Sequence, residues 1–224
     1  NHVNLVKLFH EEFKDIPINV DNDANGMMLA EKWKGFITDI RCAVFLSVTD
    51  GIGSSVLESE RVLYGEHSNF GEVGHLTVDL HGEPCRCGNR GCLETFASDS
   101  AIISEINKLY PEIKVSSIEK VIDLAKTRDN GIYAVLKRVA DYILIAMYTV
   151  FSVYDPGLVI LGSTWLPHYP ELFRQISDEM YRRFSWVNER KLKLEVRDIR
   201  DMIPLSSGAI AVESFFLNPP NLLN

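Results

Sequence analysis

Apolar residues along the chain follow two alternating kinds of spacing. Intervals of three, four and seven residues between Ile132 and Val150 predict a long helix with one buried face. The uninterrupted apolar run at 158–161 predicts a fully buried strand. Helices that alternate with strands are typical of a layered α/β fold. The predicted helices cover 4–14, 24–34, 100–109, 118–126, 131–154, 170–184 and 207–216, and the predicted strands cover 17–21, 41–48, 54–58, 158–161 and 191–196.

Two of the predicted strands form a hairpin. A continuous β run extends from Arg41 to Val48, and a second one covers 54–58. The turn between them, Thr49-Asp50-Gly51-Ile52-Gly53, contains glycine, as hairpin turns usually do. Cys42 lies in the apolar part of the first strand, so we expect it to be a small buried hydrophobic residue.

Asn22 and Asp23 lie between the predicted strand 17–21 and the predicted helix 24–34. Polar residues at this position are typical of helix caps, because their side chains accept hydrogen bonds from the first backbone amides. Taken alone, the two residues would need no other role.

Composition limits the partners and the location of the chain. The formal charge is −8, and Lys and Arg gather only near 182–183 and 190–193, so the basic face of a DNA-binding domain is absent. No apolar run approaches the roughly 20 residues that span a bilayer. The first residues lack the features of a signal peptide. We therefore expect a cytoplasmic location, no membrane contact and no direct contact of this chain with nucleic acid.

Three of the four cysteines lie within eight residues, in Cys85-Arg86-Cys87-Gly88-Asn89-Arg90-Gly91-Cys92, and His75 lies ten residues earlier. Three thiolates and one imidazole form a closed tetrahedral set of zinc ligands. Such a site has no free position for catalysis, so His75, Cys85, Cys87 and Cys92 predict structural Zn2+. The alternatives are redox-active or free thiols, and a nucleic-acid zinc knuckle, which the acidic charge disfavours.

Four motifs in this order resemble those of the ROK family (repressors, open reading frames, kinases). The resemblance extends over about 17–216. The motifs are Asn22-Asp23-Ala24-Asn25, Gly71-Glu72-Val73-Gly74-His75, the cysteine cluster followed by Leu93-Glu94, and Asp155-Pro156 with Val159-Ile160-Leu161-Gly162.

The resemblance implies an actin-like, ribonuclease H-like sugar-kinase fold with two lobes and a sugar in the cleft between them. Residues 1–38 would end the first lobe, and 39–204 would form the second lobe with the zinc and sugar sites. Residues 205–224 would be a C-terminal helix and tail that pack back toward the first lobe.

The resemblance also implies a set of sugar-binding residues. They are Asn22, Asp23, Glu72, His75 and Glu94, with one ring nitrogen of His75 on zinc and the other on the sugar. In the kinases of the family, Asp23 would be the general base, acting with ATP and Mg2+. Without the resemblance, Glu94 would be a carboxylate in the first turn of a helix and Glu72 a solvated charge.

Two departures from the kinase pattern resemble the transcriptional regulators of the family. Thr49-Asp50 replaces part of the phosphate-side turn of the kinases, and Gly162-Ser163 replaces their late Gly-Gly. A carboxylate at Asp50 would oppose the approach of a polyphosphate. The leading hypothesis is thus the effector-binding and oligomerisation region of a sugar-responsive regulator. The alternatives are a hexose kinase fragment, and a protein-binding domain with a vestigial sugar pocket.

The expected partners follow from the regulator hypothesis. They are a sugar or sugar phosphate and further copies of the chain, as a homodimer or homotetramer. DNA would be bound only through an N-terminal helix-turn-helix domain, which this sequence does not contain, so we expect a portion of a longer regulator.

Overall fold

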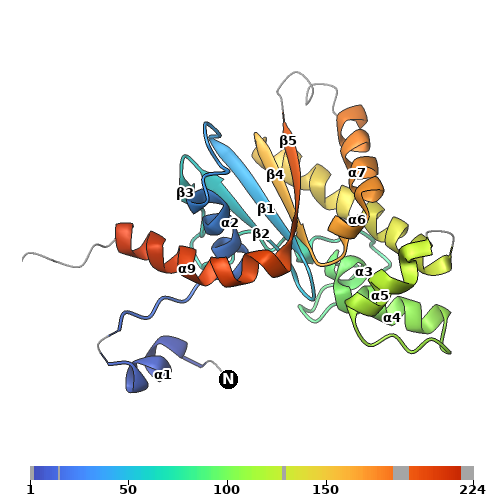
Figure 1. Ribbon diagram of the computed structural model, residues 1–224, viewed down its shortest axis with the longest axis horizontal. Coiled ribbons are helices and arrows are strands. Elements are labelled where there is room, and N and C mark those ends of the chain that lie inside the picture. Colours follow the sequence, from blue (N-terminus) through green and yellow to red (C-terminus); the bar gives the residue numbers. More distant parts are fainter. Residues whose placement is uncertain (1–2, 15, 128–129, 184–191, 218–224) are drawn as a thin grey trace, which may run out of the picture.

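The computed structural model describes residues 3–14, 16–127, 130–183 and 192–217, and its centre is a five-stranded mixed sheet in the order β3-β2-β1-β4-β5 (Figure 1). The pairs β1–β2 and β2–β3 are antiparallel, whereas β1–β4 and β4–β5 are parallel. The strands are β1 (Cys42–Val48), β2 (Ile52–Glu58), β3 (Arg61–Val62), β4 (Leu158–Ser163) and β5 (Lys193–Asp198).

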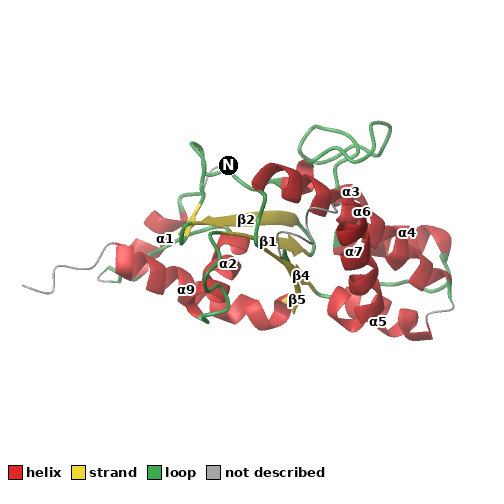
Figure 2. Ribbon diagram, turned by 90° about the horizontal axis from the view of Figure 1, so that it is seen from above, coloured by secondary structure: helices red, strands yellow, loops and turns green. Residues whose placement is uncertain are grey.

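Helices cover both faces of the sheet, as Figure 2 shows from above. The long helix α6 and α7 pack on one face, and α2 and α9 pack together on the other. Three shorter helices, α3 to α5, gather beside α6. The bounds are α1 (Leu5–Glu12), α2 (Asp23–Trp33), α3 (Glu94–Ala97), α4 (Asp99–Leu109), α5 (Ile118–Leu124), α6 (Gly131–Tyr154), α7 (Pro170–Arg183) and α9 (Ile199–Leu217), with 3-10 turns at Val73–His75, Ala125–Thr127 and Leu166–His168.

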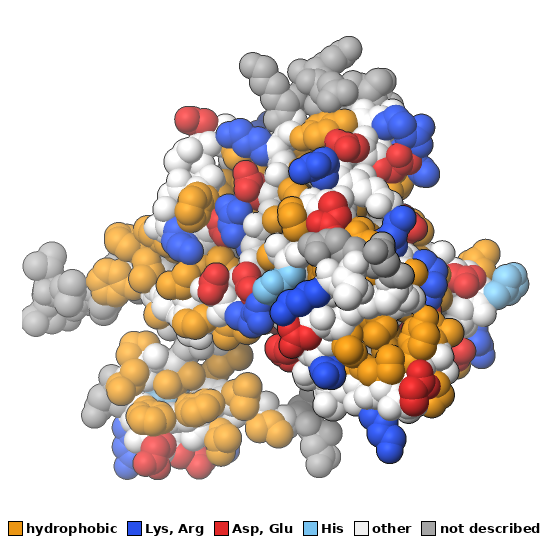
Figure 3. Space-filling view, turned by 45° about the vertical axis from the view of Figure 1, so that its right-hand side comes forward, with side chains coloured by type: hydrophobic (Ala, Val, Ile, Leu, Met, Phe, Trp, Pro, Cys, Tyr) orange, Lys and Arg blue, Asp and Glu red, His pale blue; other side chains and the backbone are white. Residues whose placement is uncertain are grey.

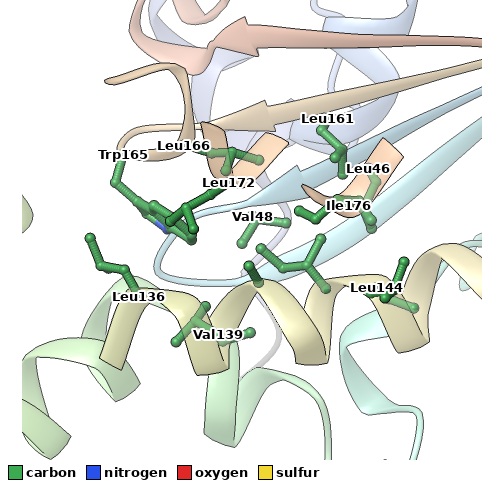
Figure 4. Packing of buried hydrophobic residues seen from close by; sticks show 14 of the residues in the cluster. Leu46, Val48, Leu136, Val139, Leu144, Leu161, Trp165, Leu166, Leu172 and Ile176 are labelled. Atoms are coloured by element: carbon green, nitrogen blue, oxygen red, sulfur yellow. The ribbon is translucent and has the colours of Figure 1, made fainter. Parts of the chain in front are cut away.

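The central strands are apolar at nearly every position because both of their faces are buried. Along β1, Val44 and Leu46 pack toward α6 and α7, whereas Ala43 and Phe45 pack toward α2 and α9. Successive side chains of a strand point to opposite faces, so a continuous apolar run supplies both cores. Figure 4 shows the α6–α7 side, where Leu136 of α6 lies near Trp165, and Val139 and Leu144 lie on the side of α6 that faces Val48 and Leu46.

The helix α1 lies below α9 in Figure 1, and Phe9 and Phe13 line one pocket together with Ile210 and Ala211 of α9. The apolar residues of α1, among them Leu5, Leu8, Phe9 and Phe13, are exposed, and Figure 3 shows hydrophobic side chains gathered on it at the lower left. None of the described helices is both long and apolar enough to cross a membrane.

Most predicted elements are confirmed, with bounds that shift by a few residues. The predicted strand at 17–21 is wrong: these residues form no regular structure, because a strand needs a paired neighbour and no described strand lies beside them. The last helix begins at Ile199 rather than 207, although Pro204 lies inside it. Buried Ile199 and Met202 tie its first turns to the core, and packing of this kind overrides local propensity.

Two further bounds need separate mention. Phe184 and Lys191, the predicted end of one helix and start of one strand, lie outside the described residues. The expected boundary between 204 and 205 falls inside the continuous helix α9, which packs along α2.

Candidate functional site

The structure brings the four predicted metal ligands together. One nitrogen of His75 and the sulfurs of Cys85, Cys87 and Cys92 all lie within 4.8 Å of one another. Nδ1 of His75 is 3.7 Å from the Cys85 sulfur, and the sulfurs of Cys87 and Cys92 are 3.7 Å apart. With Zn–S bonds of about 2.3 Å, a tetrahedral site places its sulfurs about 3.8 Å apart. These spacings therefore fit one tetrahedral ion, and all four cysteines of the chain are free thiols.

Glycines let the cysteine loop turn tightly enough to gather its sulfurs. Gly88 and Gly91 have φ of +92° and +62°, a region that side chains with a Cβ rarely adopt. A Cβ on Gly91 would lie 1.6 Å from the carbonyl oxygen of Asp79. The backbone amide of Cys85 donates to the Asn89 carbonyl over 2.8 Å, which closes the loop. Cys92 is fully buried and Cys87 is exposed, so the cluster lies at the protein surface.

Glu72 and His75 lie on the loop that follows β3 and packs against β2. The glycines of their motif permit this contact: a Cβ on Gly71 would lie 2.0 Å from the Ser54 carbonyl oxygen, and a Cβ on Gly74 would lie 2.2 Å from that of Ile52. Nε2 of His75 lies 3.9 Å from a carboxylate oxygen of Glu72. The ring thus turns Nδ1 toward the sulfurs and Nε2 toward Glu72.

Glu94 links the cysteine loop to the hairpin turn. It is nearly buried, at 8% exposure, and accepts a hydrogen bond from the backbone amide of Ile52 over 3.2 Å. Arg86 holds the same carboxylate through Nε at 2.9 Å and Nη2 at 3.2 Å. Sequence reasoning missed Arg86. The available signal was the presence of a basic residue between Cys85 and Cys87.

Asn22 and Asp23 lie at the N-terminus of α2. Both side chains accept a hydrogen bond from the backbone amide of Ala24, at 2.9 and 2.8 Å, so the predicted capping is confirmed. Both residues are exposed. Asp23 lines a cavity of about 620 Å³, and Glu94 lines another of about 320 Å³. Asp50 lies between them, because it lines both cavities.

The larger cavity is strongly acidic. Four carboxylates line it, those of Asp23, Asp50, Asp99 and Glu119. Arg200 also lines it, but its guanidinium donates to Asp198 over 2.9 and 2.5 Å. Sequence reasoning missed Asp99, Glu119 and Arg200, since only the tertiary structure brings them to Asp23.

Asp99 is the most unusual of these carboxyl groups. It is 6% exposed; one oxygen accepts from the Thr164 hydroxyl over 2.9 Å, and Oδ1 has no partner among the described residues. Burial, together with the charges of Asp50 and Glu119, raises the pKa of Asp99 to about 6. The cavity therefore concentrates negative charge at the end of β1.

Comparison with known proteins identifies the family to which this chain is similar. The model of the ROK family matches residues 1–202. The chain is 29% identical over 212 residues to the xylose repressor of Caldicellulosiruptor bescii, an alignment that covers 89% of this chain and 53% of the repressor. The chain thus spans about half the length of this curated relative.

Solved structures show the same fold. A ROK family transcriptional regulator, a homologue of the E. coli MLC protein, has a TM-score of 0.82 at 26% identity and covers 95% of this chain and 55% of its own. The ROK hexokinase of Thermus thermophilus has a TM-score of 0.78 at 27% identity, over 95% of this chain and 70% of its own. The fold is therefore the actin-like sugar-kinase fold, which regulators and kinases share. On its motifs, its fold and the family match over most of its length, this chain belongs to the ROK family.

Proposed function

We propose that this chain is the effector-binding region of a sugar-responsive transcriptional regulator. The observation that carries the proposal is the acidic cavity beside the hairpin turn. Thr49 and Asp50 belong to that turn, and they line the cavity together with Asp23, Asp99 and Glu119. A kinase needs cations, metal ions and free backbone amides around the phosphates of ATP, because charge stabilisation provides most of the catalysis of phosphoryl transfer.

The backbone of the turn also opposes a phosphate-binding role. The amide of Thr49 donates to the Gly51 carbonyl over 3.1 Å, and the amide of Ile52 donates to the Glu94 carboxylate over 3.2 Å. These amides are therefore satisfied within the protein. A phosphate that used either of these two amides would have to break its bond while approaching four carboxylates.

Structural zinc is the second part of the proposal. His75, Cys85, Cys87 and Cys92 would hold the ion, which would supply no chemistry beyond fixing the loop. Arg86 lies between two of these ligands and contacts Glu94. An ordered loop would thus hold Glu94 in position, and the ion on Nδ1 of His75 would leave Nε2 as an oriented hydrogen-bond donor.

The sugar would contact Asn22, Asp23, Glu72, His75 and Glu94. Carboxylates and carboxamides suit a polyol, because each hydroxyl both donates and accepts hydrogen bonds. Exposure of Asn22 and Asp23, and the position of Glu72 beside Nε2 of His75, support this assignment. DNA would be bound through a separate N-terminal helix-turn-helix domain of the intact protein.

A hexose kinase is the second candidate, and the position of Asp23 favours it. The carboxylate is exposed at a helix N-terminus and lines the larger cavity, where a general base could act on a sugar hydroxyl. Under this alternative, ATP and Mg2+ would occupy that cavity, and a bound metal ion would offset part of its negative charge.

One set of measurements on the intact protein separates the candidates. Isothermal titration with xylose, glucose, N-acetylglucosamine and the 6-phosphates of the last two should give binding of at least one compound. That compound should change the affinity of the protein for its operator DNA, and no phosphate should leave ATP. Sugar phosphorylation that is lost in Asp23→Ala would establish the kinase, and failure to bind any compound of the panel would contradict the proposed effector site.

A further inference from the structure

Asp21, the residue before Asn22-Asp23, is the centre of a small hydrogen-bond network. One carboxylate oxygen accepts from the Tyr64 hydroxyl over 2.8 Å. The other accepts from the Asn25 side chain over 2.8 Å and from the backbone amide of Asn22 over 2.7 Å. Asp21 is thus held by the helix that it precedes and, through Tyr64, by a distant part of the chain.

The sheet fixes the position of Tyr64. The amide of Leu63 donates to the Val56 carbonyl over 2.9 Å, which continues the pairing of β3 with β2 up to the neighbour of Tyr64. The loop that leads to Glu72 and His75 then begins at Gly65. A single hydroxyl therefore connects the N-terminus of α2 with the start of the loop that carries two other proposed sugar contacts.

The segment before Asp21 lies beside α9, because residues 16–21 line one pocket together with Ile210 and Ala211. Residues 16–20 form no strand, and Ile16 and Val20 are each 55% exposed. The side chain of Asn19 accepts from the Ser214 hydroxyl of α9 over 2.8 Å. The bond to Tyr64 therefore ties the junction of this segment with α2 to the part of the chain that follows β3.

The Tyr64 hydroxyl remains a donor to Asp21 although the side chain is 42% exposed. Partial burial, and then the hydrogen bond to Asp21, raise the pKa of Tyr64 above its usual range. The hydroxyl thus keeps its proton, and remains a donor, across the pH range in which proteins function. A hydrogen bond to a charged acceptor is also stronger than one between neutral groups.

We propose that Asp21 and Tyr64 are a positioning pair, which fixes Asn22 and Asp23 relative to the Glu72–His75 loop and so sets sugar affinity. This inference rests on the proposed sugar site. Neither residue needs to touch the sugar. Their effect is preorganisation: side chains that are already in place lose less conformational entropy when the ligand binds.

Three variants of the intact protein test the pair, with a matched control. Tyr64→Phe and Asp21→Ala each remove the bond, and the double variant closes a mutant cycle. Tyr181→Phe is the control, because it also deletes one tyrosine hydroxyl that donates a hydrogen bond, to the Leu192 carbonyl over 3.0 Å, from α7. Titration uses the compound of the panel above that the wild type binds most tightly.

Tyr64→Phe should weaken binding about three- to tenfold, the range expected for one hydrogen bond, and Asp21→Ala should weaken it at least as much. The double variant should be no weaker than the worse single variant, because both remove the same bond. Tyr181→Phe should bind like the wild type even though its thermal midpoint falls. Asp21→Ala keeps the measurement decisive if Tyr64→Phe fails to fold.

The possible failures are distinct. A wild type that binds nothing in the panel contradicts the proposed function. If the wild type binds a sugar and Tyr64→Phe or Asp21→Ala binds it equally well, the positioning pair alone is overturned. Equal losses in Tyr64→Phe and Tyr181→Phe, or additive losses in the double variant, would also overturn it, since they indicate a general effect of stability or two unrelated contacts.

Discussion

At the scale of single residues, Asp99 connects burial with pH. Its pKa rises from 3.8 to about 6, chiefly through burial of the charged form. The folded protein therefore holds this proton more tightly than the unfolded chain. The resulting contribution to stability is complete below about pH 4 and is lost as the pH rises through 6.

Asp99→Asn should consequently stabilise the protein near pH 7. One pKa unit corresponds to about 1.4 kcal/mol, so the gain in the free energy of unfolding is at most on the order of 3 kcal/mol. The gain should shrink toward pH 4. Urea unfolding at several pH values measures it, with Asp178→Asn on the exposed face of α7 as the control. A gain that is independent of pH would contradict the explanation from the buried charge.

The cysteine cluster makes a second prediction at the residue scale. Protein purified without added metal should contain one zinc ion per chain by elemental analysis. Removal of the ion should lower the thermal midpoint, because the free energy of metal binding contributes to folding. Cys92→Ser should reduce both zinc content and the midpoint.

Cys42→Ser provides the matched control for zinc. Cys42 is half-buried, and its thiol lies 3.6 Å from the Tyr154 carbonyl oxygen, outside the cluster. This variant should keep its zinc, whatever it loses in stability. Wild-type protein that is free of metal and equally stable with and without added zinc would rule out the structural ion.

At the scale of elements, a buried ion pair connects α2 to β5. Glu31 is fully buried, and Nε of Arg197 lies 2.9 Å from one of its oxygens. The other oxygen has no partner among the described residues. The guanidinium also lies over the ring of Phe36, 5.2 Å from its centroid. The pair therefore fixes the helix that presents Asn22 and Asp23 against the sheet.

Removing one partner of this pair should be costly. Arg197→Met leaves the Glu31 carboxylate buried without a counter-charge, and losses of about 3–5 kcal/mol in the free energy of unfolding are typical of such changes. The double variant Glu31→Leu with Arg197→Met should lose less, because no isolated charge remains. Urea unfolding tests both. Lys126→Ala, which breaks an exposed pair with Asp123, should change little. A larger loss in the double variant would contradict this account.

Helix prediction succeeded where local pattern and packing agree. The buried stripe of α6 contains all eight of the predicted positions: Ile132, Val135, Leu136, Val139, Ile143, Ala146, Met147 and Val150.

Strand prediction failed where the neighbours in the fold determine the backbone conformation. Residues 17–21 were predicted to form a strand, but without a pairing partner their backbone is irregular. Gly26 of α2 also depends on its neighbours in the fold. A Cβ there would lie 2.9 Å from Ser206 of α9, so close packing of the two helices explains why glycine occupies this helical position.

At the scale of the whole molecule, the sheet and its two helical layers carry the loops of the two cavities at one end. The hairpin turn, the cysteine loop and the N-terminus of α4 contribute to the smaller cavity, and the N-termini of α2 and α4 with α9 line the larger one. Charges of both signs are mixed on the face in Figure 3, so this view shows no basic surface for DNA.

The intact protein should be a homodimer or homotetramer, because regulators that read two-fold symmetric operators are themselves symmetric. The lobe at 39–204 is the expected contact surface. Light scattering at micromolar concentration should give a mass at least twice that of one chain. A strictly monomeric intact protein would contradict this prediction, without affecting the sugar site.

The sequence by itself determined the family, the buried strands and α6, and the four clustered metal-ligand candidates, because each depends on residues close together in the chain or on ordered motifs. Only the tertiary structure decided which charges share a space. Asp23, Asp50, Asp99 and Glu119 come from separate segments and meet at one cavity, and Tyr64 reaches Asp21 across 43 positions. Local spacing carries no information on such encounters, since they depend on how the sheet and its helices pack.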